Sequence, residues 1–332
     1  MKDELNIVLS TNERYMPGAT VALVSLAVNA RPETSLHFHV FTEQVKAESW
    51  KRLENSILRV HARSVIENHV CGEDILSGLP EYSGSRIAWV RCFYPRLLPD
   101  VDWALYVDCD ILYLASPEEH FAYATDDVYA CVVKDMSPNS SAGDVPWAKA
   151  KCGVALSADM YFNSGVMLFN FEKFRQNGIP EKIAEFIKKH PDGYYADQTA
   201  MNVIFNGNRL RYIPSKFNYI QTYLNDEAFL QRPVIHYVNG IPWIPKISTV
   251  ANGRYMLWHA FADKYIWMNK GESEKRLFGF SHRMLIRLEA FLLKSRIFEP
   301  FFHLALIVIG KRSCYERWKW SQVGHDITKF DI

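Results

Sequence analysis

Trp103-Ala-Leu-Tyr-Val107 is a short apolar segment that leads directly into Asp108-Cys109-Asp110. The segment has the length and composition of a buried strand, and side chains two apart in a strand point to the same side. Two carboxylates placed in this way form an oxygen site for a hard divalent cation. In open α/β sheets, ligands bind at the carboxyl ends of the strands, so position on the sheet is what favours a metal site here.

The chain contains a control for that argument. Asp100-Val101-Asp102 has the same spacing, but it precedes the strand and follows Pro99, which is typical of a solvated turn. Asp108 and Asp110 differ because apolar runs flank them on both sides. Two acids in such surroundings are costly unless a cation or strong donors accompany them. We therefore interpret only Asp108 and Asp110 as a metal site.

Strand-like and helix-like segments alternate along the rest of the chain, which predicts an α/β fold with a mainly parallel sheet. We expect strands at 5–9, 36–41, 103–107, 127–133, 165–169 and 234–235, and helices at 19–29, 46–59, 86–98, 181–189, 197–205 and 254–268. Pro95 should bend or end the helix that contains it. Residues 137–159 are polar and rich in small side chains, and we expect a mobile loop there.

Composition is that of an ordinary globular protein, with 332 residues of which 48% are hydrophobic and 23% charged. The formal net charge of +1 gives the molecule no field that would attract a nucleic acid, so we expect no nucleic-acid partner. Six cysteines are scattered without a C-x-x-C pair, and neither a zinc site nor a disulfide framework follows from them. The N-terminus shows no apolar signal region, and we expect a cytoplasmic protein.

The C-terminal region differs from the rest of the chain in charge and composition. From Lys270 onward the chain carries a net charge of +5, and the part before it a net charge of −4. Residues 276–296 resemble a basic amphipathic helix, and the apolar run 301–310 is too short to span a bilayer. We divide the chain into a domain at 1–268 and a basic, helical appendage at 269–332. Two interpretations of the appendage can coexist: it binds an anionic membrane surface, which would make the protein peripheral on the inner face of the cytoplasmic membrane, and it packs on the core as a helical subdomain.

His236 follows the short apolar segment Val234-Ile235. A lone histidine in such a place is usually structural, but a carboxylate pair at another strand end makes it a candidate third ligand. Two aspartates and one imidazole suit Mn²⁺ or Mg²⁺, with positions left for diphosphate oxygens and water. Taken alone, Asn163-Ser164-Gly165 is typical of a turn and Asp197 of a helix cap.

Several motifs in order make the chain similar to a known family. These are a polar turn ending in Tyr15, Tyr94-Pro-Arg96-Leu, Leu105-Tyr-Val-Asp-Cys-Asp-Ile-Leu112, Phe162-Asn-Ser-Gly-Val-Met-Leu168, Asp197-Gln198, and His236 followed by Pro242-Trp243. Over roughly residues 5–268 the chain resembles the family 8 retaining glycosyltransferases, which include bacterial lipopolysaccharide galactosyl- and glucosyltransferases and glycogenin.

The resemblance implies a nucleotide-sugar-binding domain of the GT-A type with a mixed, mainly parallel central sheet, a UDP-sugar donor and Mn²⁺ (or Mg²⁺). It assigns the metal to Asp108, Asp110 and His236. It implies catalytic roles for Gln198, Asp197 and Asp135. The donor-binding positions that it implies are Ser10, Thr11, Asn12 and Tyr15 for the uridine, Arg96, Asp135, Asn163 and Asp197 for the sugar, Gln198 near the anomeric carbon, and Asp108, Cys109, Asp110, Ser164, His236 and Gly240.

Two positions depart from the family pattern. Asn12 stands where an acid usually accepts from the uracil N–H, although its carbonyl oxygen can also accept. Ile241 stands where a lysine commonly reaches the diphosphate, and Lys246 is the nearest substitute.

The predicted function is transfer of a hexose, glucose or galactose, from a UDP-sugar to a saccharide or glycolipid acceptor such as lipopolysaccharide core. A non-catalytic UDP-sugar-binding protein and a metal-dependent nucleotidyltransferase are the alternatives.

Overall fold

The computed structural model describes residues 4–81, 84–136, 138–191, 196–220, 230–238, 241–243, 253–268, 272 and 277. The chain divides into two compact units, one made of residues 1–220 with Val234–His236 and the other of residues 221–233 with 237–332. The predicted boundary after residue 268 lies inside the second unit and stays a prediction. The predicted features of the basic tail lie almost entirely outside the described residues.

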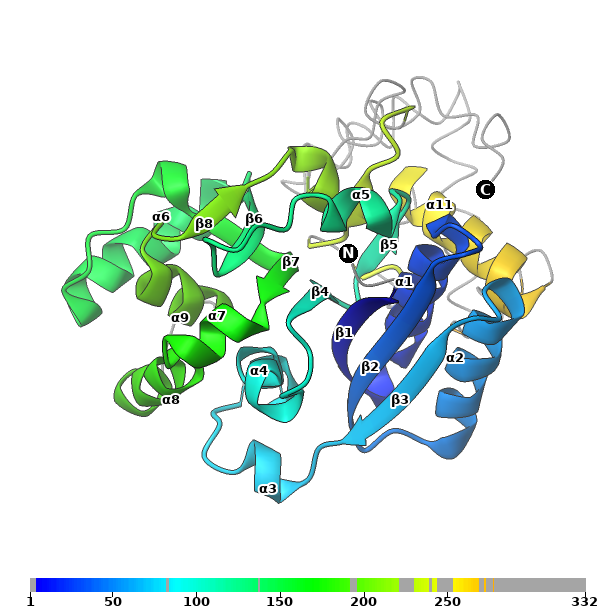
Figure 1. The fold of residues 1–332 in the computed structure, drawn as a ribbon, viewed down its shortest axis with the longest axis horizontal. Helices are drawn as coiled ribbons and strands as arrows, with labels where there is room; N and C mark the ends of the chain where they lie inside the picture. Colours follow the sequence, from blue (N-terminus) through cyan, green and yellow to red (C-terminus); the bar gives the residue numbers. More distant parts are fainter. Residues whose placement is uncertain are drawn as a thin grey trace, which may run out of the picture. The chain divides into compact units, whose positions relative to one another are not determined.

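A seven-stranded sheet forms the centre of the first unit (Figure 1). Its strands, in spatial order, are β3 (Val65–Val70), β2 (Ser35–Glu43), β1 (Glu4–Asn12), β4 (Trp103–Val107), β7 (Phe162–Asn170), β6 (Ala130–Lys134) and β8 (Leu210–Tyr212). Four of the six pairings are parallel, and only the two that involve β7 are antiparallel. The predicted mixed, mainly parallel sheet is therefore confirmed.

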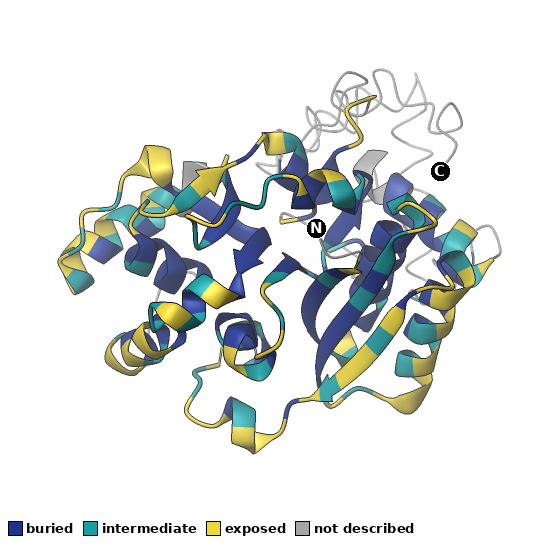
Figure 2. Cartoon of the chain, in the orientation of Figure 1, coloured by how far each residue is buried: buried dark blue, intermediate teal, exposed yellow. Residues whose placement is uncertain are grey.

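Strand β2 shows why the sheet forms where the pattern predicts it. Leu36, Phe38 and Val40 are completely buried on one face, while His37 and His39 alternate with them on the other. Buried residues concentrate on the central strands, whereas edge strand β3 is largely exposed (Figure 2). The centre of the sheet is therefore buried, and both edge strands, β3 and β8, are exposed to solvent.

The longer helices of the first unit lie close to their predicted ranges. They are α1 (Met16–Asn29), α2 (Ala47–Val60), α8 (Ile179–Lys189) and α9 (Ala196–Phe205), with shorter α3 (Glu73–Leu76), α5 (Pro117–Phe121) and α7 (Phe171–Gln176) between strands. Helix α1 packs against α2 and against β5 (Ile111–Tyr113), so it is apolar nearly all round.

Two predicted segments differ from the structure. The single helix expected at 86–98 is instead a 3-10 helix at Ile87–Cys92 followed by α4 (Tyr94–Leu97), because Pro95 fits only in a first helical turn. The loop expected at 137–159 is wrong. It contains α6 (Pro138–Trp147), a π-helical turn at Ala148–Cys152 and, at its end, a 3-10 turn at Ala158–Met160.

Two strand pairings bring distant segments to one edge of the sheet. Because β7 is antiparallel to β4, Val107 pairs with Val166, and the start of β7 lies at the carboxyl end of β4. Strand β5 forms a separate two-stranded sheet with β9 (Val234–His236), in which Ile111 pairs with His236. The polar residues that follow β4, begin β7 and end β9 must therefore meet.

The second unit is described only in part. It includes α11 (Gly253–Ala262), which continues into a π-helical turn at Asp263–Trp267. The rings of Trp243 and Trp258 lie 5.7 Å apart, and His259 Nε2 donates to the carbonyl of Pro242 over 3.1 Å. Within the described ranges, no helix combines the length and apolar character needed to cross a membrane.

Candidate active site

Asp108 and Asp110 lie in the turn between β4 and β5 and not within a strand. The argument from alternating strand side chains is therefore wrong, since β4 already ends at Val107. The pairing of β5 with β9 still brings in His236, whose Nε2 lies 3.3 Å from Asp110 Oδ1 and 3.8 Å from Asp108 Oδ2. One ligand atom from each residue can be chosen so that all three lie within 4.8 Å of one another, as in a metal site.

A chain of amide hydrogen bonds sets the orientation of the His236 ring. The backbone N–H of Gly165 donates to Asn163 Oδ1 over 3.0 Å, and the Asn218 Nδ2 donates to the same oxygen over 2.8 Å. Asn218 therefore presents its Oδ1 to His236 Nδ1, 3.0 Å away, and that nitrogen must be the donor. When the ring is neutral, as a metal ligand must be, its lone pair lies on Nε2, the nitrogen that faces the two carboxylates.

Gly165 lets the three ligands approach one another. A β-carbon at this position would lie 2.2 Å from His236 Cε1 and 2.9 Å from Asp108 Oδ2, closer than atoms can pack. The Gly165 carbonyl also accepts from the Asp108 backbone N–H over 2.8 Å. The glycine in the sequence Asn163-Ser164-Gly165 is thus required by the close packing of His236 and Asp108 around it.

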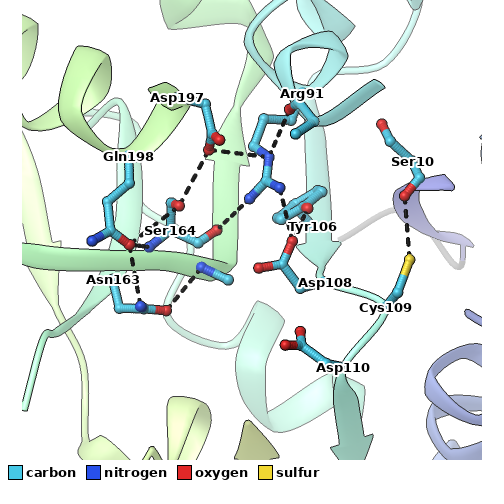
Figure 3. A network of polar contacts seen from close by, with 12 residues as sticks. Ser10, Arg91, Tyr106, Asp108, Cys109, Asp110, Asn163, Ser164, Asp197 and Gln198 are labelled. Atoms are coloured by element: carbon cyan, nitrogen blue, oxygen red, sulfur yellow. Dashed lines mark hydrogen bonds and ion pairs between the residues drawn. The ribbon is translucent and has the colours of Figure 1, made fainter. Parts of the chain in front are cut away.

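Arg91 is the arginine that the structure brings into this cluster (Figure 3). Its guanidinium is buried and forms ion pairs with Asp108 (2.9 Å) and Asp197 (3.2 Å), and it stacks 4.3 Å from the centre of the Tyr106 ring. Arg96, the predicted arginine, is instead exposed and pairs with Glu181 at 2.7 Å. The two lie on different helices: the 3-10 helix buries Arg91, whereas α4 buries Tyr94 and Pro95 and leaves Arg96 exposed.

The pKa values of the carboxyl groups reflect their burial. Burial raises the pKa of Asp108 despite the attraction of Arg91, and it raises the pKa of Asp197 to about 6. Burial alone would also raise the pKa of Asp110, but a protonated His236 ring attracts this carboxylate and donates a hydrogen bond to it, and these two effects lower the pKa overall. Arg91 forms ion pairs with Asp108 and Asp197, and Asp110 lies beside His236, so three carboxylates have a single guanidinium among them and the cluster can accommodate further positive charge.

Gln198 is held by hydrogen bonds at both the oxygen and the nitrogen of its carboxamide, and Figure 3 shows those of the oxygen. Its Oε1 accepts from the backbone N–H of Ser164 (3.0 Å) and from Asn163 Nδ2 (3.1 Å). Its Nε2 donates to the hydroxyl of Tyr161 (3.0 Å) and to Asp135 (3.4 Å). The structure therefore places Gln198, Asn163, Ser164 and Asp135 in one buried network next to the cluster.

A cavity of about 220 Å³ opens beside the aspartates. Its walls include the predicted uridine-binding residues and the predicted metal ligands of the turn, namely Ser10, Thr11, Asn12, Tyr15, Asp108, Cys109 and Asp110. Asn12 Oδ1 is buried and has no hydrogen-bond partner within the described part of the chain. The Cys109 Sγ donates to the Ser10 carbonyl over 3.3 Å, which ties the turn to the end of β1.

Some predicted residues do not enter this picture. Gly240 and Lys246 lie outside the described residues, so their predicted roles stay predictions. Conversely, sequence reasoning missed Arg91 and Asn218. A charged residue between Trp89-Val90 and Cys92-Phe93 is the same signal of a buried charge that singled out the aspartates, and it could have found Arg91. Asn218 carries no comparable signal.

Comparisons with known proteins bear on this arrangement. Residues 6–244 match the family model described as Glycosyl transferase family 8. The chain belongs to this family. The predicted family is confirmed, and a member of it is expected to be a glycosyltransferase.

Several known proteins are about a quarter identical to this chain over the part that aligns with it. General stress protein A of Bacillus subtilis is 27% identical, over 61% of this chain and 70% of that protein. Lipopolysaccharide 1,2-glucosyltransferase of Escherichia coli is 27% identical, over 67% of this chain and 64% of that protein. Lipopolysaccharide 1,3-galactosyltransferase of Salmonella typhimurium is 27% identical, over 65% and 64%. The chain spans less than two thirds of the length of these two lipopolysaccharide transferases.

Solved structures share the fold. The bifunctional glycosyltransferase WbbM has a TM-score of 0.66 at 17% identity, covering 83% of this chain and 52% of that one. Galactosyltransferase LgtC, in complex with donor and acceptor sugar analogs, has a TM-score of 0.65 at 21% identity, covering 82% and 100%. These likenesses confirm the predicted GT-A type of architecture.

Proposed function

We propose that this protein is a metal-dependent retaining glycosyltransferase that moves glucose or galactose from a UDP-sugar to a saccharide of the lipopolysaccharide type. The observation that carries the proposal is the convergence of Asp108, Asp110 and His236 beside a cavity at the carboxyl end of β4. Family membership and the printed names of the lipopolysaccharide transferases support the reaction class and the acceptor class.

The donor set fits Mn²⁺ or Mg²⁺. Two carboxylates and one neutral imidazole supply hard and borderline ligands, and the amide network already turns the lone pair of His236 toward the carboxylates. When bound, such a cation would neutralise the charge that develops on the diphosphate leaving group. The residues Asp108, Asp110 and His236 would hold it.

The surrounding side chains position the donor. Asn12 offers its unpartnered Oδ1 to the N–H of the uracil ring in the cavity wall. Asp135, Asn163 and Asp197 would accept or donate hydrogen bonds to sugar hydroxyls, and Asp197 is held for this by Arg91. Arg91 adds fixed positive charge close to the proposed metal site, in a buried setting where its electrostatic effect is strong.

Gln198 acts by position in this proposal. Its Oε1 already accepts from the Ser164 backbone N–H and from Asn163, so the lone pairs that a nucleophile needs are engaged. Attack by the acceptor hydroxyl on the same face as the departing UDP is therefore favoured over a covalent intermediate on Gln198. The carboxamide of Gln198 would lie near the anomeric carbon as a fixed polar group that forms no bond to it.

The predicted association of residues 269–332 with anionic lipid remains part of the proposal, because a glycolipid acceptor lies at a membrane. The full chain should partition with vesicles that contain anionic lipid, and a chain ending at residue 269 should stay in solution. Equal partitioning of the two chains would contradict membrane association through this region and leave the transfer reaction untouched.

The transfer reaction is tested by the release of UDP from UDP-glucose and UDP-galactose, measured with Mn²⁺ and a lipopolysaccharide-core acceptor. Asp110→Asn should lower kcat by about 100-fold or more, because the charge of the leaving group loses its stabilisation. Asp100→Asn is the matched control, since Asp100 is an exposed aspartate in the turn before β4, and it should leave kcat unchanged.

The alternative functions give different products in the same assay. A binding protein would bind UDP-sugar without releasing UDP, an outcome that Ile241 would help to explain because it stands in place of a lysine. A nucleotidyltransferase would release pyrophosphate from UTP. Either result would overturn the proposed transfer.

A further inference from the structure

A second cluster of metal-ligating side chains lies on the face of the sheet formed by β2 and β3. Parallel register places Glu67 of β3 opposite His39 of β2, with His37 two residues before His39 on the same face and His69 two residues after Glu67. All four side chains therefore project from one patch of two neighbouring strands. The cluster shares no residue with the site at the end of β4.

The distances within this cluster match those between ligands of one metal ion. Glu67 Oε1 lies 3.1 Å from His37 Nε2, and Glu67 Oε2 lies 3.4 Å from His39 Nδ1 and 3.4 Å from His69 Nε2. His39 Nδ1 and His69 Nε2 are 3.3 Å apart. Ligand atoms at about 2.0–2.1 Å from a tetrahedral ion are separated by roughly 3.3 Å.

Hydrogen bonds leave ligand atoms directed into the cluster. His39 Nε2 lies 3.2 Å from Asn6 Oδ1, and donation of its proton there places the lone pair of the neutral ring on Nδ1. His37 Nε2 is buried and, although close to Glu67, has no partner with hydrogen-bond geometry among the described residues. This nitrogen is shielded from solvent and lies beside a carboxylate at the separation expected for two ligands of one ion, so a bound ion would satisfy both groups.

We propose that His37, His39 and Glu67, with His69 as a fourth ligand, bind a transition-metal ion of the Zn²⁺ class. Imidazole-rich sets select Zn²⁺ and its neighbours over Mg²⁺ or Ca²⁺, which prefer oxygen. The site differs in this respect from the aspartate-rich site at the end of β4. Glu67 is 46% exposed and His39 only 4%, so an ion can enter from solvent and reach a buried ligand.

The role of this ion would be structural. Strand β3 is the edge of the sheet, and Val65 and Val70 on it are 45% and 70% exposed, so few apolar contacts hold it. An ion bound by His37 and His39 on one side and by Glu67 and His69 on the other would cross-link β3 to β2. Metal binding would therefore stabilise the folded state in proportion to its affinity.

The test uses the full chain without a histidine tag, carrying Asp110→Asn so that the site at the end of β4 is disabled. After treatment with a chelator, Co²⁺ should give the intense visible absorption of a tetrahedral site at one ion per chain. Zn²⁺ should displace it and raise the melting temperature. Calorimetry with ZnCl₂ then gives the affinity.

Glu67→Gln and His39→Ala should weaken Zn²⁺ binding at least as much as the roughly 10–100-fold that loss of a second-shell partner costs. His190→Ala is the control, because the His190 ring packs against Trp147 and Phe186. Glu67→Gln keeps the shape of the side chain, so its melting temperature without metal should match that of the parent. Absence of tetrahedral Co²⁺ absorption in the parent, or equal Zn²⁺ affinity in Glu67→Gln, would overturn the proposal.

Discussion

The two clusters of metal ligands in this protein are made of similar parts and placed differently. Asp108, Asp110 and His236 come from a turn and from the end of a short strand, next to a cavity. His37, His39 and Glu67 come from the middle of two paired strands. A site in turns can present an open side to a substrate, whereas a site on a strand face can hold the strands together. Position in the fold, more than ligand chemistry, therefore assigns their roles.

Their charge surroundings differ as well. We call Asp108, Asp110 and His236 the turn cluster. Beside it lie Arg91 and Asp197, a buried ion pair in which the arginine also contacts Asp108. We call His37, His39, Glu67 and His69 the strand cluster. It has Glu67 as its central carboxylate and Asn6 as a neutral neighbour. A fixed cation next to a metal site is useful where a diphosphate must be bound, and it has no use in a structural site.

The largest expected effect concerns that buried arginine. Arg91→Met should lower the free energy of unfolding by about 3–5 kcal/mol, because it leaves Asp108 and Asp197 buried without their partner. Arg96→Met removes an exposed pair with Glu181 and should cost less than about 1 kcal/mol. Urea unfolding of both variants measures the difference. Similar costs would mean that Arg91 is not the buried cation of the site.

Gly165 tests how closely the turn cluster is packed. Gly165→Ala should displace His236 or Asp108, and a displacement of about 1 Å can lower the rate of transfer by roughly 100-fold. Gly78→Ala is a suitable comparison, because φ is +77° there and a β-carbon would meet no atom within 4 Å. It should cost stability through backbone strain and leave kcat unaltered. An unchanged kcat in Gly165→Ala would contradict the close approach of the ligands.

Each cluster has an amide that orients one of its histidines, which allows a matched comparison. Asn218→Leu should weaken Mn²⁺ binding at the turn cluster by about 10–100-fold, because His236 Nδ1 loses its acceptor. Asn6→Leu should do the same to Zn²⁺ binding at the strand cluster through His39. Calorimetry with both metals should show that each variant affects its own site only. Crossed effects would mean that the clusters are not independent.

An imidazole that belongs to neither cluster gives the baseline for pH effects. Burial lowers the pKa of His120 to about 3, so the unfolded chain binds a proton near its ordinary pKa of about 6.5 while the folded chain does not. Stability should therefore fall as pH drops below 6.5, by roughly 1 kcal/mol per pH unit. In His120→Gln this part of the slope should disappear. The pH dependence of urea unfolding checks it, and an unchanged slope would contradict the assignment.

The sequence predicts the candidate metal ligands of the active site better than the residues that pair with those ligands and orient them. Asp108, Asp110 and His236 could be found because each borders an apolar strand, although they meet through the pairing of β5 with β9 in a separate two-stranded sheet. Arg91 and Arg96 lie in one segment of helical character, but the structure divides it into a 3-10 helix that buries Arg91 and a helix, α4, that buries Tyr94 and Pro95 and leaves Arg96 exposed. Asn218 lies in no sequence pattern that would single it out, because its role depends on a hydrogen bond to His236, a residue of β9 that is distant in the sequence.

The prediction of a loop at 137–159 was wrong for a related reason. Its small and polar residues lack a strong helical pattern, and α6 gains its place through tertiary contacts. Asp144 of that helix accepts from Thr199 of α9 over 2.8 Å and from the hydroxyl of Tyr161. Local propensity is a weak guide where such long-range contacts decide the structure.

The central claim is tested most directly by counting bound Mn²⁺ with electron paramagnetic resonance while the metal is titrated into the chelator-treated protein with UDP present. We expect one Mn²⁺ per wild-type chain, loss of that ion in Asp110→Asn, and its retention in Glu67→Gln. Equal Mn²⁺ binding by Asp110→Asn and by the wild-type chain would contradict the account.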